Sequence, residues 1–131
     1  MAKRSRTKGV QWEQEVARTL RDAFPGLADG IRRTAPLQAA DGEAAPDVSF
    51  PGLWLECKCG ARPRPGAALE QAIQAAPVGA IPVAVVRIDQ KRPGEESLRF
   101  ACLPLAAFVR LLAASTYVPA DGAFYEEEDT E

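Results

Sequence analysis

The chain has 131 residues, of which 47% are hydrophobic, and its formal net charge is −2. This length allows one small domain with a modest core and excludes a second domain of similar size. No apolar run approaches the roughly 20 residues that cross a bilayer, and the basic N-terminus does not resemble an apolar signal segment. We therefore expect a cytoplasmic protein without a membrane partner.

The first predicted element is an amphipathic helix from Gly9 to Phe24, which ends at Pro25-Gly26. Glu13 lies within its apolar stripe, where a carboxylate is costly unless it is paired or binds a metal. Glu13 is therefore either a functional ligand or the partner of a basic side chain near the helix start. Glu15 projects almost opposite, so we expect it to face solvent. The other members of the stripe are Val10, Val16, Ala17, Leu20 and Phe24.

A short strand from Gly30 to Thr34 and a loop over residues 35–45 come next, followed by a hairpin over residues 47–59. Pro51-Gly52 forms its two-residue turn, and Asp47 opens its first strand. Because side chains alternate between the two faces of a strand, the second strand separates a polar set from an apolar set. One face carries Trp54, Glu56 and Lys58, and the other carries Leu53, Leu55, Cys57 and Cys59.

A short helix over residues 67–76 ends before Pro77. The nearly continuous apolar run over residues 81–88 predicts a central strand that is parallel to its neighbour and covered on both faces. A strand over residues 98–103 and a helix from Pro104 complete the order αβββαββα, an α/β fold with a mixed sheet flanked by helices. One face of that last helix carries Leu105, Phe108, Val109 and Leu112.

Three regions divide the chain. Residues 1–8 form a basic N-terminal arm, residues 9–115 form the domain, and residues 116–131 form an acidic tail that we expect to be disordered. Five of the 18 acidic residues lie within residues 126–131, so residues 1–125 carry 16 basic and 13 acidic groups, a net charge of about +3. The basic groups are also clustered, and local clusters can follow a phosphate backbone even when the total charge is low.

The absence of histidine excludes imidazole bases, histidine metal sites and Ser-His-Asp triads. Asp47 and Glu56 supply hard oxygen ligands that, with the backbone carbonyl of Cys57, suit Mg²⁺, with Mn²⁺ as a substitute. Lys58 on the same face as Glu56 could orient or deprotonate a water and offset charge on a phosphate. This set predicts metal-dependent phosphodiester hydrolysis.

Three cysteines offer neither a disulfide framework nor the four ligands of a structural zinc site. We interpret Cys57 and Cys59 as buried thiols. A thiol or metal sensor built on this Cys-x-Cys pair is the alternative.

Pro46-Asp47 followed by Glu56-Cys57-Lys58 resembles the PD-(D/E)XK nuclease superfamily, and within it the archaeal-type and phage Holliday junction resolvases. The similarity extends over about residues 7–113. Two departures bear on the choice of substrate: residues 35–45 lack the Ser-Gly that often precedes Pro-Asp, and threonine stands where serine is common. Further matching positions are Lys8-Gly9 followed by Glu13, the run Arg32-Arg33-Thr34, and Gln71 with Gln74 on the helix after the lysine.

The resemblance implies a restriction-endonuclease-like core and a Mg²⁺-dependent, structure-selective DNA endonuclease. Such an enzyme would resolve four-way junctions as a homodimer. It would be nucleoid-associated in a bacterial, archaeal or phage-infected cell. Exposed aromatic residues at Trp54 and Phe124-Tyr125 would favour a dimer surface. The implied catalytic residues are Glu13, Asp47, Glu56 and Lys58, and the implied metal ligands are Glu13, Asp47, Glu56 and Cys57. The expected DNA contacts are Lys3, Arg4, Arg6, Lys8, Arg32, Arg33, Thr34, Arg62, Arg64 and Gln71.

Two alternatives keep the same fold. One is a nuclease for a flap, a nick or a specific duplex site, and the other is a DNA-binding domain without turnover. Lys91-Arg92, in a Lys-Arg-Pro-Gly turn, is interpreted as a solvated surface pair rather than as part of a site.

Overall fold

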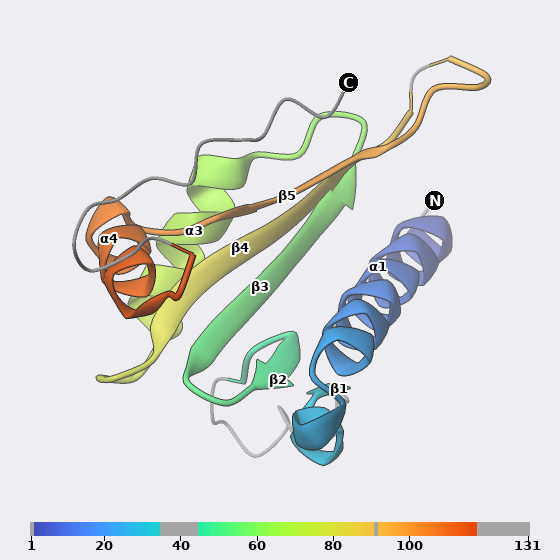
Figure 1. Cartoon of the computed structure of the whole chain (residues 1–131). Coiled ribbons are helices and arrows are strands. Elements are labelled where there is room, and N and C mark those ends of the chain that lie inside the picture. Colours follow the sequence, from blue (N-terminus) through green and yellow to red (C-terminus); the bar gives the residue numbers. More distant parts are fainter. Residues whose placement is uncertain (1, 35–44, 91, 118–131) are drawn as a thin grey trace, which may run out of the picture.

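The structure, a computed structural model, describes residues 2–34, 45–90 and 92–117. The elements follow the predicted order αβββαββα, with one short 3₁₀ helix added after the first helix (Figure 1). The elements are α1 (Ala2–Ala23), η1 (Pro25–Gly30), β1 (Arg32–Arg33), β2 (Val48–Phe50), β3 (Leu53–Gly60), α3 (Pro65–Ala75), β4 (Ile81–Ile88), β5 (Leu98–Cys102) and α4 (Leu105–Ala114).

One five-stranded sheet in the order β1-β2-β3-β4-β5 organises the molecule. The pair β3 and β4 is parallel and every other pair is antiparallel, so the predicted mixed sheet is confirmed. β2 and β3 form the predicted hairpin, and Gly52 in its turn has a φ of +80°, a conformation that glycine adopts without steric cost. β3 continues beyond the reach of β2, which pairs only as far as Leu55.

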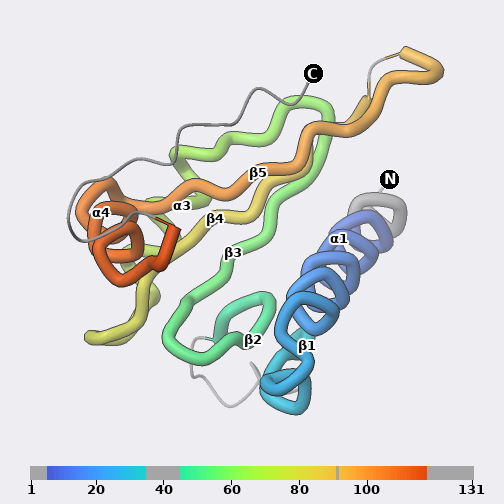
Figure 2. The backbone as a smooth tube through the Cα atoms, viewed as in Figure 1, coloured from blue at the N-terminus to red at the C-terminus, as the bar shows by residue number. Residues whose placement is uncertain are grey.

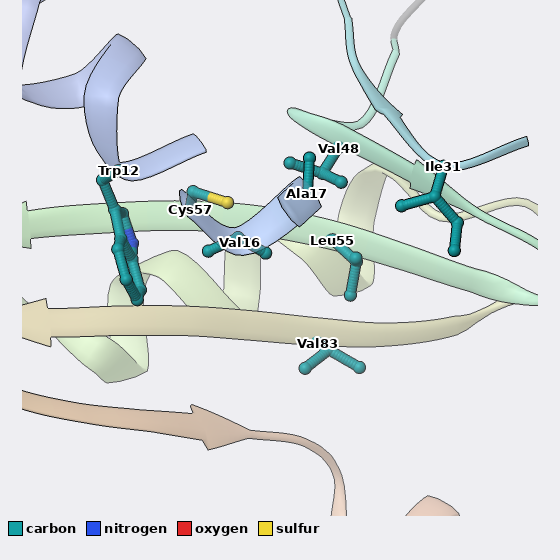
Figure 3. Packing of buried hydrophobic residues seen from close by; sticks show 8 residues of the cluster. All are labelled: Trp12, Val16, Ala17, Ile31, Val48, Leu55, Cys57 and Val83. Carbon is teal, nitrogen blue, oxygen red and sulfur yellow. The ribbon is translucent and has the colours of Figure 1, made fainter. Parts of the chain in front are cut away.

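Helix α1 covers one face of the sheet and buries the main core (Figures 1 and 2). Trp12, which the predicted stripe omitted, is only 3% exposed, and its indole Nε1 donates a hydrogen bond of 3.1 Å to the carbonyl of Val85. Glu13 therefore lies at the flank of the buried stripe and not near its middle. In Figure 3 this cluster comprises Trp12, Val16, Ala17, Ile31, Val48, Leu55, Cys57 and Val83.

Helix α3 packs on the opposite face, where Ala68 of the helix meets Ala84 and Val86 of β4. Residues 83 and 85 face α1 while residues 84 and 86 face α3, so β4 is covered on both faces as predicted. Small residues at this contact allow the helix to approach the sheet closely.

Three predicted boundaries were wrong. The expected N-terminal arm is helical from Ala2, because residues 2–8 contain good helix formers and no proline, and Gly9 costs a helix interior only about 1 kcal/mol. The strand expected from Gly30 to Thr34 is reduced to Arg32–Arg33, since η1 occupies the residues before it. Helix α3 begins two residues early at Pro65, which suits a first helical position.

Helix α4 buries little of its own surface. Ala107 is its one buried residue, whereas the predicted apolar face of the helix is largely exposed. The exposed fractions of Leu105, Phe108 and Val109 are 76%, 46% and 54%. Nine of the ten residues are apolar, so the sequence pattern could not decide which of them packs against the sheet.

Candidate functional site

Asp47 is held where β2 joins the middle of the sheet. Its backbone N–H donates to the carbonyl of Leu55 at 2.9 Å, and its carbonyl accepts from the N–H of Thr34 at 3.0 Å. Its side-chain Oδ2 accepts a hydrogen bond of 2.8 Å from the backbone N–H of Cys57, beyond the last β2 residue that pairs with β3. The carboxylate therefore caps the edge of β3, and the backbone of Asp47 is fixed by hydrogen bonds to two neighbouring segments.

Glu56 lies on β3 beside Asp47 and is 5% exposed. The indole Nε1 of Trp54 donates a hydrogen bond of 2.9 Å to its Oε1, which is consistent with the shared face predicted for residues 54, 56 and 58. Burial raises the pKa of Glu56, and the charge of Asp47 raises it further, against the opposing effects of the Trp54 hydrogen bond and the charge of Lys58. The protein thus holds a carboxyl group that releases its proton at a higher pH than an ordinary glutamate.

Glu13 reaches the same region from α1. Its Oε2 accepts a hydrogen bond of 2.6 Å from Nε of Arg33 on β1. Burial raises the pKa of Glu13 most strongly, the hydrogen bond from Arg33 lowers it, and the charge of Asp47 raises it again. Glu13 is therefore affected by the charge of Asp47 and is also paired with Arg33. The first contact supports its interpretation as a ligand, and the second supports its interpretation as an ion-pair partner.

Lys58 lies on the α3 side of the sheet. With Arg64, Gln71 and two alanines of α3 it lines a hollow of about 230 Å³. Lys58, Arg64 and Gln71 are all exposed, and Arg64 is the residue that precedes the first turn of α3. The hollow thus offers two cationic groups and one amide to an anion, on the face of β3 that also carries Glu56.

The thiols of Cys57 and Cys59 lie in the core under α1. Cys57 is buried beneath α1, and burial together with the nearby carboxylates raises its pKa far above the ordinary thiol value. Burial also raises the pKa of Cys59. Both cysteines pack with the core under α1, as predicted, so they behave as small apolar side chains.

The donor set suits a hard cation in kind, since Asp47, Glu56 and Glu13 all offer carboxylate oxygens. Across residues 2–34, 45–90 and 92–117, no group of three or more acidic, cysteine or histidine side chains converges closely enough to hold a metal ion. Glu13 is instead engaged by Arg33. The two acids at residues 47 and 56 are brought together, and the third stands beside them in an ion pair.

The expected DNA contacts fall into different situations. Arg6, Arg32, Arg62 and Arg64 are exposed. Lys8 forms an ion pair of 2.7 Å with Asp89. Thr34 is half-buried beside Asp47. The side chains of Lys3 and Arg4 lie outside the described part of the structure, as do Lys91, Phe124, Tyr125 and the acidic residues of the tail.

Two predictions about single residues were wrong. Glu15 does not face solvent freely, because Nε and Nη2 of Arg99 on β5 donate to its two oxygens at 2.6 Å and 3.2 Å. Trp54 is 8% exposed and so cannot be an aromatic group of a dimer surface. The Glu15 error arises from a contact between segments 84 positions apart in the chain, for which the sequence carries no local signal.

No family model matches the chain, and comparisons with curated proteins and with solved structures find no match. None of the helices in the described ranges is both long and apolar enough to cross a membrane.

Proposed function

We propose that this protein is a metal-dependent DNA endonuclease with a restriction-endonuclease-like core, and that it resolves four-way DNA junctions. The observation that carries the proposal is the pairing of Asp47 with Glu56 across the β2–β3 hairpin. Asp47 bonds to the backbone of residue 57, and its charge acts on both Glu56 and Glu13. The sequence resemblance to the PD-(D/E)XK nucleases involves these same residues.

In this proposal Asp47 and Glu56 hold a small divalent cation, with Glu13 and the Cys57 carbonyl completing its protein ligands. Bound Mg²⁺ or Mn²⁺ would polarise the scissile phosphate and lower the pKa of a bound water. Lys58, on the same strand face as Glu56, would orient or deprotonate the attacking water and offset the charge that develops on the phosphate. Burial of Glu56 limits its access to bulk water, which strengthens electrostatic interactions at the site.

Substrate binding in the proposal uses the exposed basic groups around the site. The hollow between Lys58, Arg64 and Gln71 is wide enough for a phosphate group and offers donors from two elements. Arg32 and Arg62 are exposed and available for further backbone contacts. Contacts of this kind position a duplex without reading its sequence, which suits an enzyme that selects DNA by shape.

The homodimer is part of the same proposal. One chain supplies one site, and resolving a junction takes two symmetric cuts, which a two-fold dimer provides directly. The exposed apolar side chains of α4 support a subunit contact, because a helix that is apolar on nearly all sides is normally covered.

A second function is favoured by one contact. The 2.6 Å ion pair of Glu13 with Arg33 is what a DNA-binding domain without turnover would retain for stability alone. A nuclease specific for a flap, a nick or a duplex remains the alternative within the enzyme class.

The deciding experiment incubates the purified protein and Mg²⁺ with labelled junction, flap, nicked and linear duplex DNA. We expect the wild type to cleave the junction and Asp47→Ala, Glu56→Ala and Lys58→Ala not to cleave it. Each variant should still bind DNA, because affinity comes mainly from basic contacts to phosphates. Glu70→Gln, at an exposed position of α3, is the matched control and should cleave normally. Normal turnover by any folded variant of the three would refute the assigned site, and uncut DNA in every lane would favour the binding domain.

A further inference from the structure

The side chain of Arg33 forms an ion pair with Glu13, one of the three carboxylates around the candidate site. Its Nε lies 2.6 Å from Oε2 of Glu13, and the two side chains are 25% and 19% exposed. A charge-assisted hydrogen bond of this length between partly buried groups is strong. A guanidinium stays protonated at all ordinary pH values, so a change of pH cannot remove its charge from Glu13.

The position of Arg33 ties this ion pair to the site. Arg33 faces Val48 across the β1–β2 pair, and the next residue, Thr34, donates its N–H to the carbonyl of Asp47. The strand that carries Arg33 is thus bonded to the residue at the centre of the site. A displacement of the guanidinium by one hydrogen-bond length would change what Glu13 can bind.

We propose that Arg33 is a positioning residue that withholds Glu13 from the metal in the free protein and releases it when a phosphate of the bound DNA takes the guanidinium. A phosphate is the competitor that fits, since its oxygens accept two parallel N–H bonds from a guanidinium as a carboxylate does. The inference rests on the proposed function. It adds that DNA and metal bind cooperatively, and it names the residue that couples them.

The simpler role for Arg33 is structural, in which it only neutralises Glu13 and keeps α1 on the sheet. The two roles differ in what happens to metal affinity when Arg33 is removed. A residue that withholds a ligand and repels a cation lowers metal affinity, so its removal raises that affinity. A purely structural residue leaves metal affinity unchanged, or its removal lowers the affinity through misplacement of Glu13.

The first measurement is calorimetric titration of Mn²⁺ into the DNA-free protein at pH 8. We expect Arg33→Gln to bind Mn²⁺ at least about fivefold more tightly than the wild type, which is the lower range of allosteric coupling. Arg18→Gln is the matched control, because Arg18 is an exposed arginine of α1 outside the candidate site and outside the expected DNA contacts. In a Glu13→Gln background the gain from Arg33→Gln should be clearly smaller, since no carboxylate is left to release and only the repulsion of the cation is removed.

The second measurement uses fluorescence anisotropy of a labelled junction in a Lys58→Ala background, where the proposed chemistry is blocked. Mn²⁺ should raise DNA affinity in this protein, and by linkage DNA raises Mn²⁺ affinity by the same factor. The added Arg33→Gln change should remove most of that coupling, whereas Arg18→Gln should retain it. If Arg33→Gln does not fold, Arg33→Met keeps the aliphatic stem and serves in its place.

The outcomes separate the two proposals. Mn²⁺ binding that Asp47→Asn abolishes but Arg33→Gln leaves equal or weaker would overturn the role of Arg33 and leave the metal site standing. No Mn²⁺ binding by the wild type or by Arg33→Gln, with or without DNA, would overturn the proposed function and this inference with it. Tight binding by Arg33→Gln alone would support both.

Discussion

At the scale of single residues, the candidate site contains two acids, Glu13 and Glu56, whose pKa values are raised by burial. Glu56 is the one charged side chain that is buried within the described ranges, and its single indole hydrogen bond does not offset the burial. A group retained at a cost to stability is typical of a functional position, where stability and activity conflict. This conflict can be measured.

Glu56→Gln should stabilise the protein at pH 8 by about 1 kcal/mol while abolishing cleavage. A carboxyl group whose pKa is raised by folding contributes stability at low pH and loses it as pH rises through the raised value, so the neutral amide has the advantage only above that pH. The amide oxygen can still accept the Trp54 hydrogen bond. Thermal unfolding at pH 8 and near pH 4 measures the difference, which should shrink at the lower pH. An equal loss of stability at both values would show that burial of the charge is not the cause.

Glu13→Gln and Glu15→Gln should separate the proposed catalytic role of α1 from the packing of α1 on the sheet. Glu13→Gln keeps an acceptor for Arg33 but loses the ligand charge, so we expect cleavage to fall at least about tenfold. Glu15→Gln weakens a partly exposed pair with Arg99, which is worth only about 0.2–1 kcal/mol, and cleavage should change little. Cleavage rates and urea unfolding of both variants check this. A larger loss of cleavage at Glu15 would mean that the helix presents a different face to the site.

At the scale of elements, α1 is the part that completes the site, because it brings Glu13 to a sheet that carries the other acids. Trp12 anchors it through burial and through the bond to Val85, and its ring also lies under the guanidinium of Arg87, 5.4 Å from the ring centroid. The pairs Lys8–Asp89 and Glu15–Arg99 tie the same helix to residue 89, just after β4, and to β5. The position of Glu13 therefore depends on contacts made by its neighbours along the helix.

Trp12→Ala should destabilise the protein by about 3–5 kcal/mol, since it removes a large buried side chain. Trp12→Phe retains most of the packing and loses the indole hydrogen bond, at about 1 kcal/mol. Chemical denaturation measures both values. We expect the folded fraction of Trp12→Phe to cleave more slowly than the wild type, because a loosened α1 holds Glu13 less firmly. Full activity in Trp12→Phe would show that α1 needs no such anchor.

At the scale of the whole molecule, helix α4 lies at the far side of the sheet from η1 (Figure 1). It carries four exposed large apolar side chains, at Leu105, Phe108, Val109 and Leu111. If α4 forms the dimer contact, a charge placed there would be buried on association at high cost. Phe108→Glu should therefore give a monomer at micromolar concentration, where we expect the wild type to sediment as a dimer. Leu27→Glu, at a similarly exposed leucine of η1, is the control and should leave the dimer intact.

Junction selectivity should follow the dimer. The Phe108→Glu monomer should cut junction and duplex at similar rates, because the paired cuts need two sites in one particle. Sedimentation velocity and cleavage of both substrates test this together. A monomeric wild type that cuts junction and duplex equally would leave the nuclease proposal standing and remove the resolvase assignment.

The sequence by itself determined the order of the elements, the β2–β3 hairpin and the face on which each of its residues lies. These features are local: Pro51-Gly52 favours a turn, alternation separates the two faces of a strand, and an apolar run over residues 81–88 requires cover on both sides. The candidate acids at 47 and 56 could be paired from the sequence because only a short hairpin separates them.

Only the tertiary structure decided the partners of charged residues and the true buried stripe of α1. The Glu13–Arg33 pair links residues 20 positions apart and the Glu15–Arg99 pair spans 84 positions, so no local pattern encodes them. The period of a helix identifies an apolar stripe from the sequence. The place of Trp12 in the core became visible only in the structure, where its indole donates a hydrogen bond to the carbonyl of Val85. Charge placement and anchoring depend on which segments approach in space, and that is set by packing of the whole chain.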